Sequence, residues 1–165
     1  MASTMTEPQS YQEAMESPDV EEWKKAMDSE YNSLIENRVW DIMTRPKECK
    51  VVQTRWLYKI KQTSDGRIEH FKARLVTKGY TQSYDLDYYE TYSLVFKLAS
   101  LQVILSIRAI IDLEIYQMDI VMAFLHGNVD TEVYIEQSEG YRKGLSNTVC
   151  KLNKGLYGLK QSARL

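Results

Sequence analysis

The stretch Thr54-Arg55-Trp56-Leu57-Tyr58-Lys59-Ile60-Lys61, followed by Thr63-Ser64-Asp65-Gly66, decides the local fold of this chain. Apolar or β-branched residues alternate with mostly cationic ones along the first segment, which is the period of a strand with one buried face. The second segment is typical of a tight turn, in which Gly66 can adopt a positive φ. A return strand is expected from Arg67 to Thr77, so the sequence predicts a β-hairpin.

Cationic residues lie along both strands of the predicted hairpin. They are Arg55, Lys59, Lys61, Arg67, Lys72, Arg74 and Lys78. Such a ribbon can bind phosphate, because Lys and Arg release the counterions condensed on a nucleic acid. A solubilising edge hairpin, whose lysines discourage pairing with other chains, explains the same pattern. The residues alone leave both interpretations open.

Helical periodicity occurs on both sides of the hairpin. Ser17-Pro18-Asp19 predicts a helix start with Ser17 as N-cap, and apolar residues then recur at spacings of three and four until Asn37. A second, strongly apolar helix is expected over 98–112, after a tyrosine-rich loop at 81–92.

Short strands are expected over 114–120, 132–136 and 149–152, and a turn leading into a helix over 154–164. Residues 1–16 are polar and are expected to form a disordered tail. Helices and hairpins without regular βαβ alternation favour an α+β domain.

Composition sets the broad class of the protein. The 165 residues suit one domain, and 44% apolar with 27% charged residues is ordinary for a globular protein. No apolar run is long enough for a membrane span, and the N-terminus lacks a signal-peptide core. Two isolated cysteines, Cys49 and Cys150, favour a reducing intracellular compartment, cytoplasmic or nuclear.

The net charge of −2 hides blocks of opposite sign. Residues 49–80 hold 8 basic and 2 acidic side chains, whereas residues 81–140 hold 2 basic and 10 acidic ones. The acidic block contains Asp119, which follows an apolar segment. One carboxylate is most simply a turn or capping residue, and a two-metal site needs more than one.

Three segments, in this order along the chain, resemble the reverse transcriptases of copia-type retrotransposons. They are Lys72-Ala73-Arg74-Leu75-Val76-Thr77-Lys78-Gly79, Gln117-Met118-Asp119-Ile120-Val121-Met122-Ala123-Phe124-Leu125-His126-Gly127, and Leu156-Tyr157-Gly158-Leu159-Lys160-Gln161-Ser162-Ala163-Arg164. The similarity extends over about residues 12–165. It is the ordered set, and no single motif, that makes the resemblance specific.

The resemblance implies a role for each motif. Asp119 would ligate two Mg²⁺ ions, with the carbonyl of Ile120 as a further ligand. Phe124, five residues on, would be the aromatic gate that excludes a ribose 2′-hydroxyl. Substrate contacts are implied for Lys72 and Arg74, on the triphosphate of the incoming dNTP, and for Gly158, Lys160 and Gln161, which would line the nucleotide and template pocket.

The family pattern continues with a further catalytic motif that carries two adjacent aspartates, and then with a thumb. Neither occurs in these residues. Residues 17–165 are therefore expected to be the fingers and a partial palm, a fragment of a Pol polyprotein that is inactive on its own. Expected partners are an RNA or DNA template–primer, dNTP and the remainder of the polyprotein, and no membrane. The alternatives are a non-enzymatic nucleic-acid-binding module, or the reading frame of a decayed element without function.

Overall fold

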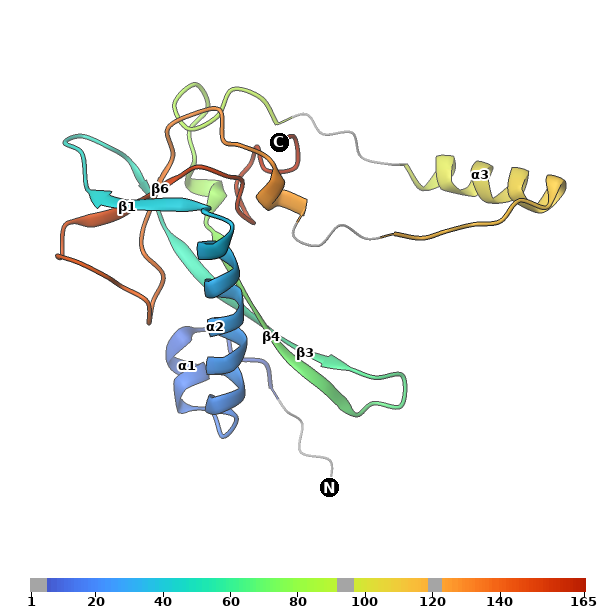
Figure 1. The fold of residues 1–165 in the computed structure, drawn as a ribbon, viewed down its shortest axis with the longest axis horizontal. Coiled ribbons are helices and arrows are strands. Elements are labelled where there is room, and N and C mark those ends of the chain that lie inside the picture. The colour runs from blue at the N-terminus through green and yellow to red at the C-terminus, as the bar shows by residue number, and fades with distance from the viewer. Residues whose placement is uncertain (1–5, 92–96, 119–122) are drawn as a thin grey trace.

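The computed structural model describes residues 6–91, 97–118 and 123–165, and it combines helices with two small sheets (Figure 1). The helices are α1 (Tyr11–Glu16), α2 (Val20–Glu36) and α3 (Leu98–Ile111), with short 3₁₀ turns η1 (Gly79–Thr81) and η2 (Ala123–His126). The strands are β1 (Trp40–Thr44), β2 (Val51–Val52), β3 (Thr54–Gln62), β4 (Ile68–Thr77), β5 (Tyr134–Ile135) and β6 (Thr148–Leu152). The predicted α+β class is confirmed.

The predicted hairpin is confirmed as β3 and β4, which pair antiparallel and form a two-stranded sheet. Gly66 in the turn has φ 79°, the left-handed conformation that glycine adopts without strain. Residues directly opposite one another lie on the same face of an antiparallel pair. Trp56 and Tyr58 thus share a buried face with their partners Leu75 and Ala73.

The α2 helix covers the buried face of the hairpin. Trp23 is 1% exposed, and its ring lies edge-on to Tyr58 and Phe71, with centroids 5.2 and 4.7 Å away. The predicted end of this helix at Asn37 is confirmed. The predicted N-cap at Ser17 is wrong, because α2 begins at Val20, and the Ser17 hydroxyl instead accepts a hydrogen bond from the Asp19 amide.

Glu30 of α2 lies buried against β4. Burial raises the pKa of this carboxyl above its ordinary value, while the Leu75 N–H, which donates to it, and the charges of Arg74 and Lys72 oppose the rise. The carboxylate therefore satisfies a backbone donor on the edge of β4 that does not pair with β3.

The second sheet has the strand order β1-β6-β5-β2. The strands expected over 132–136 and 149–152 correspond to β5 and β6. The sequence did not reveal β1 or β2. In β1 only Trp40 is buried, so no alternation is visible, and β2 has two residues.

Three expectations about local structure are corrected. Residues 11–16 form α1, with Ala14 fully buried and the Ser10 hydroxyl accepting from the Glu13 amide, so the disordered tail is wrong there. Residues 114–118 form no strand, and the rest of that expected strand, with Asp119, lies outside the described residues. Residues 154–165 form successive turns in place of a helix.

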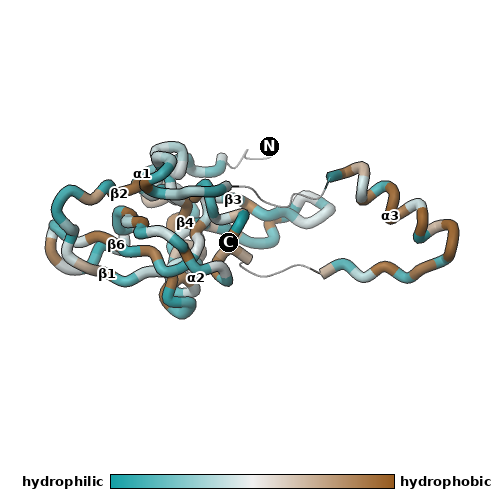
Figure 2. Tube along the Cα trace, turned by 90° about the horizontal axis from the view of Figure 1, so that it is seen from above, coloured by the Kyte–Doolittle hydropathy of each residue, from teal (hydrophilic) through white to brown (hydrophobic). Residues whose placement is uncertain are grey.

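The expected apolar helix over 98–112 is confirmed as α3, but its surroundings are unusual. It projects from the body of the protein in Figure 1, and Figure 2 shows hydrophobic residues along its length. Every residue from 97 to 118 is exposed. Helices that are apolar on all sides are normally covered on several sides, and no described residue covers this one. None of the described helices combines the length and hydropathy that crossing a bilayer requires.

Trp23→Ala is expected to lower the free energy of unfolding by about 3–5 kcal/mol, because it leaves a cavity between α2 and the hairpin. Urea unfolding followed by circular dichroism measures this change. Lys24→Ala, at the exposed neighbouring position, is the control and is expected to change stability by less than about 0.5 kcal/mol. Equal effects from both substitutions would contradict the packing of α2 described above.

Glu30→Gln is expected to gain stability relative to the wild type as pH rises from 4 to 7. A carboxyl whose folded pKa is raised contributes stability below its unfolded pKa and loses it as pH rises through the folded pKa. The amide oxygen can still accept from Leu75, and it does not ionise. Urea unfolding at both pH values measures the difference, with Glu21→Gln at an exposed position of α2 as control. A pH-independent difference for Glu30→Gln would refute the assignment.

Candidate nucleic-acid interface

The β3–β4 hairpin has one cationic face, opposite the face that packs on α2. On it, Leu57 lies opposite Arg74 and Lys59 lies opposite Lys72. Arg55 and Lys61 extend the same face of β3 and are exposed. Lys59 has an ionic partner in Glu7, 3.1 Å away, and hydrogen bonds from the Ile60 amide and from Lys59 hold the pKa of Glu7 below its ordinary value.

The remaining cations of this face are available to a ligand. Within the described ranges, no carboxylate forms an ion pair with Arg55, Lys61, Lys72 or Arg74. Arg67, also predicted to line the ribbon, is instead engaged in the turn by Asp65, with Nε 2.6 Å from the carboxylate.

Tyr157 connects two of the predicted site residues. The guanidinium carbon of Arg74 lies 4.9 Å from the centroid of the Tyr157 ring. The ring of Phe124, from η2, packs edge-on against the same ring at 4.8 Å. The structure thus brings Arg74 and Phe124 to one aromatic side chain. Sequence reasoning did not assign Tyr157 a role, although it lies within the third motif, immediately before Gly158.

A close approach between backbones fixes Tyr157 beside the end of β4. Its carbonyl oxygen accepts from the amide of Thr77 at 2.8 Å and from the Thr77 hydroxyl at 3.1 Å. Gly158 has φ 91°, and a Cβ added there would overlap the carbonyl oxygen of Thr77. A Cβ at Gly79 would in turn overlap the carbonyl oxygen of Gly158. Both glycines are therefore required for the third motif to lie against β4.

Gln161 and Lys160 attach the third motif to the loop after β4. Gln161 is fully buried, donates to the carbonyl of Asp87 at 2.9 Å and accepts from the Gln82 amide at 3.2 Å. Both the nitrogen and the oxygen of its side-chain amide are thus hydrogen-bonded within the protein. Lys160 is exposed, and its ammonium lies 3.1 Å from the Tyr88 hydroxyl. The third motif therefore lies against the loop after β4, through Gly158, Lys160 and Gln161. Of these side chains, that of Gln161 is buried and links the two segments by hydrogen bonds.

The predicted metal ligands Asp119 and Ile120 lie outside the described residues. In the part of the chain that the structure describes, no three His, Cys, Asp or Glu side chains group closely enough to hold a metal ion. The buried Asp87 is engaged by Lys50, at 2.8 Å, and by the Ser83 amide, at 2.6 Å. Among the described residues, Arg74 and Phe124 lie at Tyr157, and no group of carboxylates accompanies them.

Gly158→Ala is expected to destabilise the protein by about 2 kcal/mol or more, because it adds strain at positive φ to an overlap with Thr77. Thermal unfolding measures the loss. Gly66→Ala is the matched control: Gly66 also has positive φ, but nothing lies within 4 Å of an added Cβ. It therefore isolates the conformational cost, about 1 kcal/mol. A smaller effect at Gly158 than at Gly66 would show that the backbones do not approach as described.

Comparison with known proteins identifies the family. The sequence model of the family "Reverse transcriptase (RNA-dependent DNA polymerase)" matches residues 37–165. The chain is 42% identical over 159 residues to the retrovirus-related Pol polyprotein from transposon TNT 1-94 of Nicotiana tabacum, covering 96% of this chain and 12% of that protein. The corresponding proteins from transposons RE1 and RE2 of Arabidopsis thaliana are 43% and 42% identical over 146 and 144 residues, which is 87% and 86% of this chain.

The chain spans about a tenth of the length of these relatives. No solved structure matches the chain. The resemblance inferred from the three motifs is confirmed, since matches to plant copia-type elements extend over most of the sequence. The chain belongs to the reverse transcriptase (RNA-dependent DNA polymerase) family.

Proposed function

We propose that this chain binds the template–primer and the incoming deoxynucleotide of an RNA-directed DNA polymerase, as part of a copia-type Pol polyprotein. In this proposal the β3–β4 hairpin belongs to the fingers, and the residues from α3 onward belong to the palm. The contact of Arg74 and Phe124 with the single ring of Tyr157 carries the proposal. It brings together one residue from each of the three motifs, which supports the proposed nucleotide pocket.

Lys72 and Arg74 are proposed to bind the triphosphate. Arg74 is exposed, and its planar guanidinium suits bidentate binding to phosphate oxygens. Stacking on Tyr157 limits the conformations of this long side chain, so less entropy is lost when phosphate binds. Lys72, two residues earlier on the same face, adds a second positive charge.

Phe124 is proposed to act as the gate against ribonucleotides. Its ring is half-buried and held edge-on by Tyr157, so it presents a defined surface. A ribose 2′-hydroxyl against such a ring would lose hydrogen bonds to water without gaining a partner.

Asp119 and the carbonyl of Ile120 are proposed to hold Mg²⁺ together with the phosphates of the nucleotide. Mg²⁺ commonly takes one or two carboxylates plus substrate phosphates. Asp119 is five residues from Phe124 along the chain. When bound, the ions would stabilise charge on the attacking and leaving oxygens of phosphoryl transfer.

The double variant Arg55→Gln/Lys61→Gln removes cations of the hairpin face other than the proposed triphosphate ligands, and it is expected to weaken binding of an RNA–DNA template–primer. The slope of log affinity against log salt should fall in magnitude by up to about 2, because about 0.9 is lost for each phosphate contact. Fluorescence anisotropy between about 50 and 200 mM KCl measures both quantities.

Lys24→Gln/Lys25→Gln is the charge-matched control, since it removes two exposed cations from α2. It is expected to leave the salt slope unchanged. Equal salt slopes in the wild type and in the hairpin variant would contradict the proposed contacts between the hairpin and the phosphates of the template–primer.

A non-enzymatic nucleic-acid-binding module is the second candidate function, because Arg55 and Lys61 extend the cationic face away from Arg74 along β3. Binding of a fluorescent dNTP with Mg²⁺ discriminates the two. A nucleotide pocket predicts that Arg74→Gln weakens dNTP binding and that Phe124→Ala narrows the preference for dNTP over rNTP. A module that contacts only the nucleic-acid backbone predicts neither change.

A further inference from the structure

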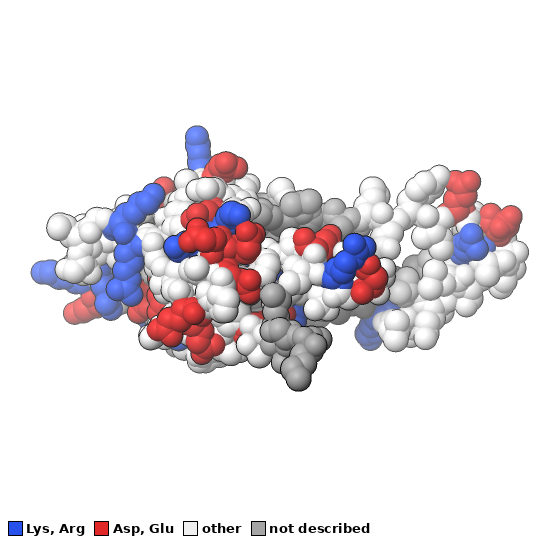
Figure 3. Space-filling view, turned by 90° about the horizontal axis from the view of Figure 1, so that it is seen from below, with Lys and Arg blue, Asp and Glu red and all other residues white. Residues whose placement is uncertain are grey.

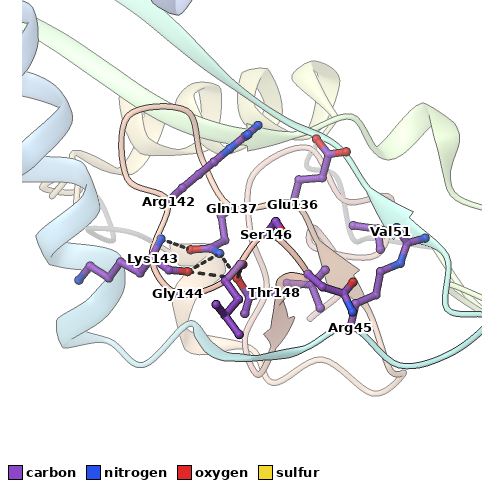
Figure 4. Close-up of a pocket in the computed structure, with 12 residues that line it drawn as sticks. Arg45, Val51, Glu136, Gln137, Arg142, Lys143, Gly144, Ser146 and Thr148 are labelled. Atoms are coloured by element: carbon purple, nitrogen blue, oxygen red, sulfur yellow. Dashed lines mark hydrogen bonds between the residues drawn. The ribbon is translucent and has the colours of Figure 1, made fainter.

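A second cationic site lies in the loops beside β1 and β6, outside the motifs discussed so far. A pocket of about 390 Å³ lies between Arg45, which follows β1, and the segment from Glu136 to Val149 (Figure 4). Arg45, Arg142 and Lys143 are among the residues that line it, and Glu136 is the one carboxylate in the lining. The lining therefore has a positive net charge.

The pocket wall is held by its own hydrogen bonds, drawn as dashed lines in Figure 4. The buried side-chain amide of Gln137 donates to the Lys143 carbonyl at 2.9 Å and to the Thr148 hydroxyl at 2.7 Å. Its oxygen accepts from the Lys143 amide at 2.8 Å. The amide of Arg45 donates to the carbonyl of Asn147 at 2.9 Å, which joins the two loops. The segment from Gln137 to Thr148 is thus pre-organised by these hydrogen bonds in the absence of a ligand.

The cations of this pocket lack the carboxylate partners found elsewhere. Cations that form ion pairs with Asp or Glu are Lys24, Lys25, Lys50, Lys59, Arg67, Lys151 and Arg164. No such pair involves Arg45, Arg142 or Lys143 over residues 6–91, 97–118 and 123–165. Figure 3 shows Lys and Arg gathered at the end of the molecule where these loops lie.

The two arginines are the side chains suited to a ligand. Arg45 uses one nitrogen, Nη2, to donate to the Cys49 carbonyl at 3.2 Å, which leaves its other donors available. Arg142 is exposed. The Lys143 ammonium instead lies 5.6 Å from the centroid of the Tyr31 ring, and in Figure 4 it points away from the arginines. Guanidinium groups match the geometry of phosphate oxygens.

We infer that this pocket binds a phosphodiester group of a nucleic-acid strand, as a phosphate site separate from the cationic face of the hairpin. Nucleic acid is the chosen ligand because of the proposed function, on which this inference rests. Two hydrogen bonds also join β3, which carries the cationic face, to the segment that lines the pocket. The Thr54 hydroxyl donates to the carbonyl of Glu136 at 3.4 Å, and the Trp56 indole donates to that of Glu139 at 3.1 Å. Arg55, where the cationic face begins, lies between these two anchors.

The test measures anisotropy of a labelled single-stranded 20-nucleotide RNA with the full chain over a range of KCl. Arg45→Gln/Arg142→Gln is expected to reduce the magnitude of the salt slope by about 0.7, the contribution of one phosphate of a single strand. Glu136→Gln is expected to act in the opposite direction and to tighten binding by about two- to fivefold, since it removes the opposing charge.

Controls separate this site from the hairpin. Lys47→Gln, on the same loop as Arg45 but outside the pocket lining, is expected to leave the slope unchanged. Combining the pocket and hairpin variants should add their slope changes. If only the hairpin variant has an effect, the pocket inference fails and the proposed function stands. If only the pocket variant has an effect, the proposed hairpin contacts fail.

The nature of the ligand is tested with two further probes. Labelled hexaglutamate is expected to bind more weakly than the RNA, and to bind equally to wild type and Arg45→Gln/Arg142→Gln. Tighter binding of hexaglutamate would assign the pocket to an acidic protein segment and overturn the inference. Inorganic phosphate at about millimolar concentration should displace RNA no more than added KCl of equal ionic strength. Stronger displacement would indicate a site for free phosphate.

Discussion

The register of the β3–β4 hairpin is the constraint on which the rest of the structure depends. Pairing Tyr58 with Ala73 places aromatic residues toward α2, and pairing Leu57 with Arg74 places cations on the other side. A slip of one residue would exchange the two faces, burying charge and exposing Trp56. The packing of Trp23 against Tyr58 and Phe71 opposes such a slip. The hydrophobic core and the cationic surface are therefore specified by the same pairing.

The third motif depends on the hairpin in turn. Thr77, the last residue of β4, bonds to Tyr157, and Gly158 allows the two backbones to meet. Because Tyr157 is fixed there, its ring can contact both Arg74 and Phe124. Residues about 80 positions apart in the sequence thus form one surface. Buried Gln161, bonded to the loop after β4, holds the same segment from its other end.

The parts that the sequence predicted correctly are those with a strong local pattern. Alternation and Gly66 predicted the hairpin, and apolar spacing predicted α2 and α3. The α1 helix and the edge strand β1 were not predicted, because few of their side chains are buried and their composition is polar or mixed. The expected helix over 154–164 is absent because Gly158 adopts a positive φ to meet Thr77, a tertiary contact that no local pattern encodes.

The candidate site was predictable only as a set of residue types. The motifs named Arg74 and Phe124 but not the ring between them, since contact through Tyr157 depends on how the third motif folds back. Gln161 was assigned to the nucleotide and template pocket through the resemblance of its motif, and in the structure its side chain is fully buried. Distinguishing a binding amide from a connecting one requires the burial and partners of the side chain. The sequence supplies neither.

The charges of the hairpin bear on two explanations, a binding surface and an edge that resists aggregation. Both strands of this two-stranded sheet are outer strands, so lysines on either one hinder pairing with other chains. Here Lys59 lies directly opposite Lys72 on the face of the sheet, and like charges in that position destabilise a strand pair. Glu7 pairs with Lys59, and no carboxylate in the described residues forms an ion pair with Lys72. Resistance to aggregation does not require like charges to face one another across a strand pair. A polyanionic ligand would remove that repulsion on binding, which is the argument for the proposed phosphate contacts.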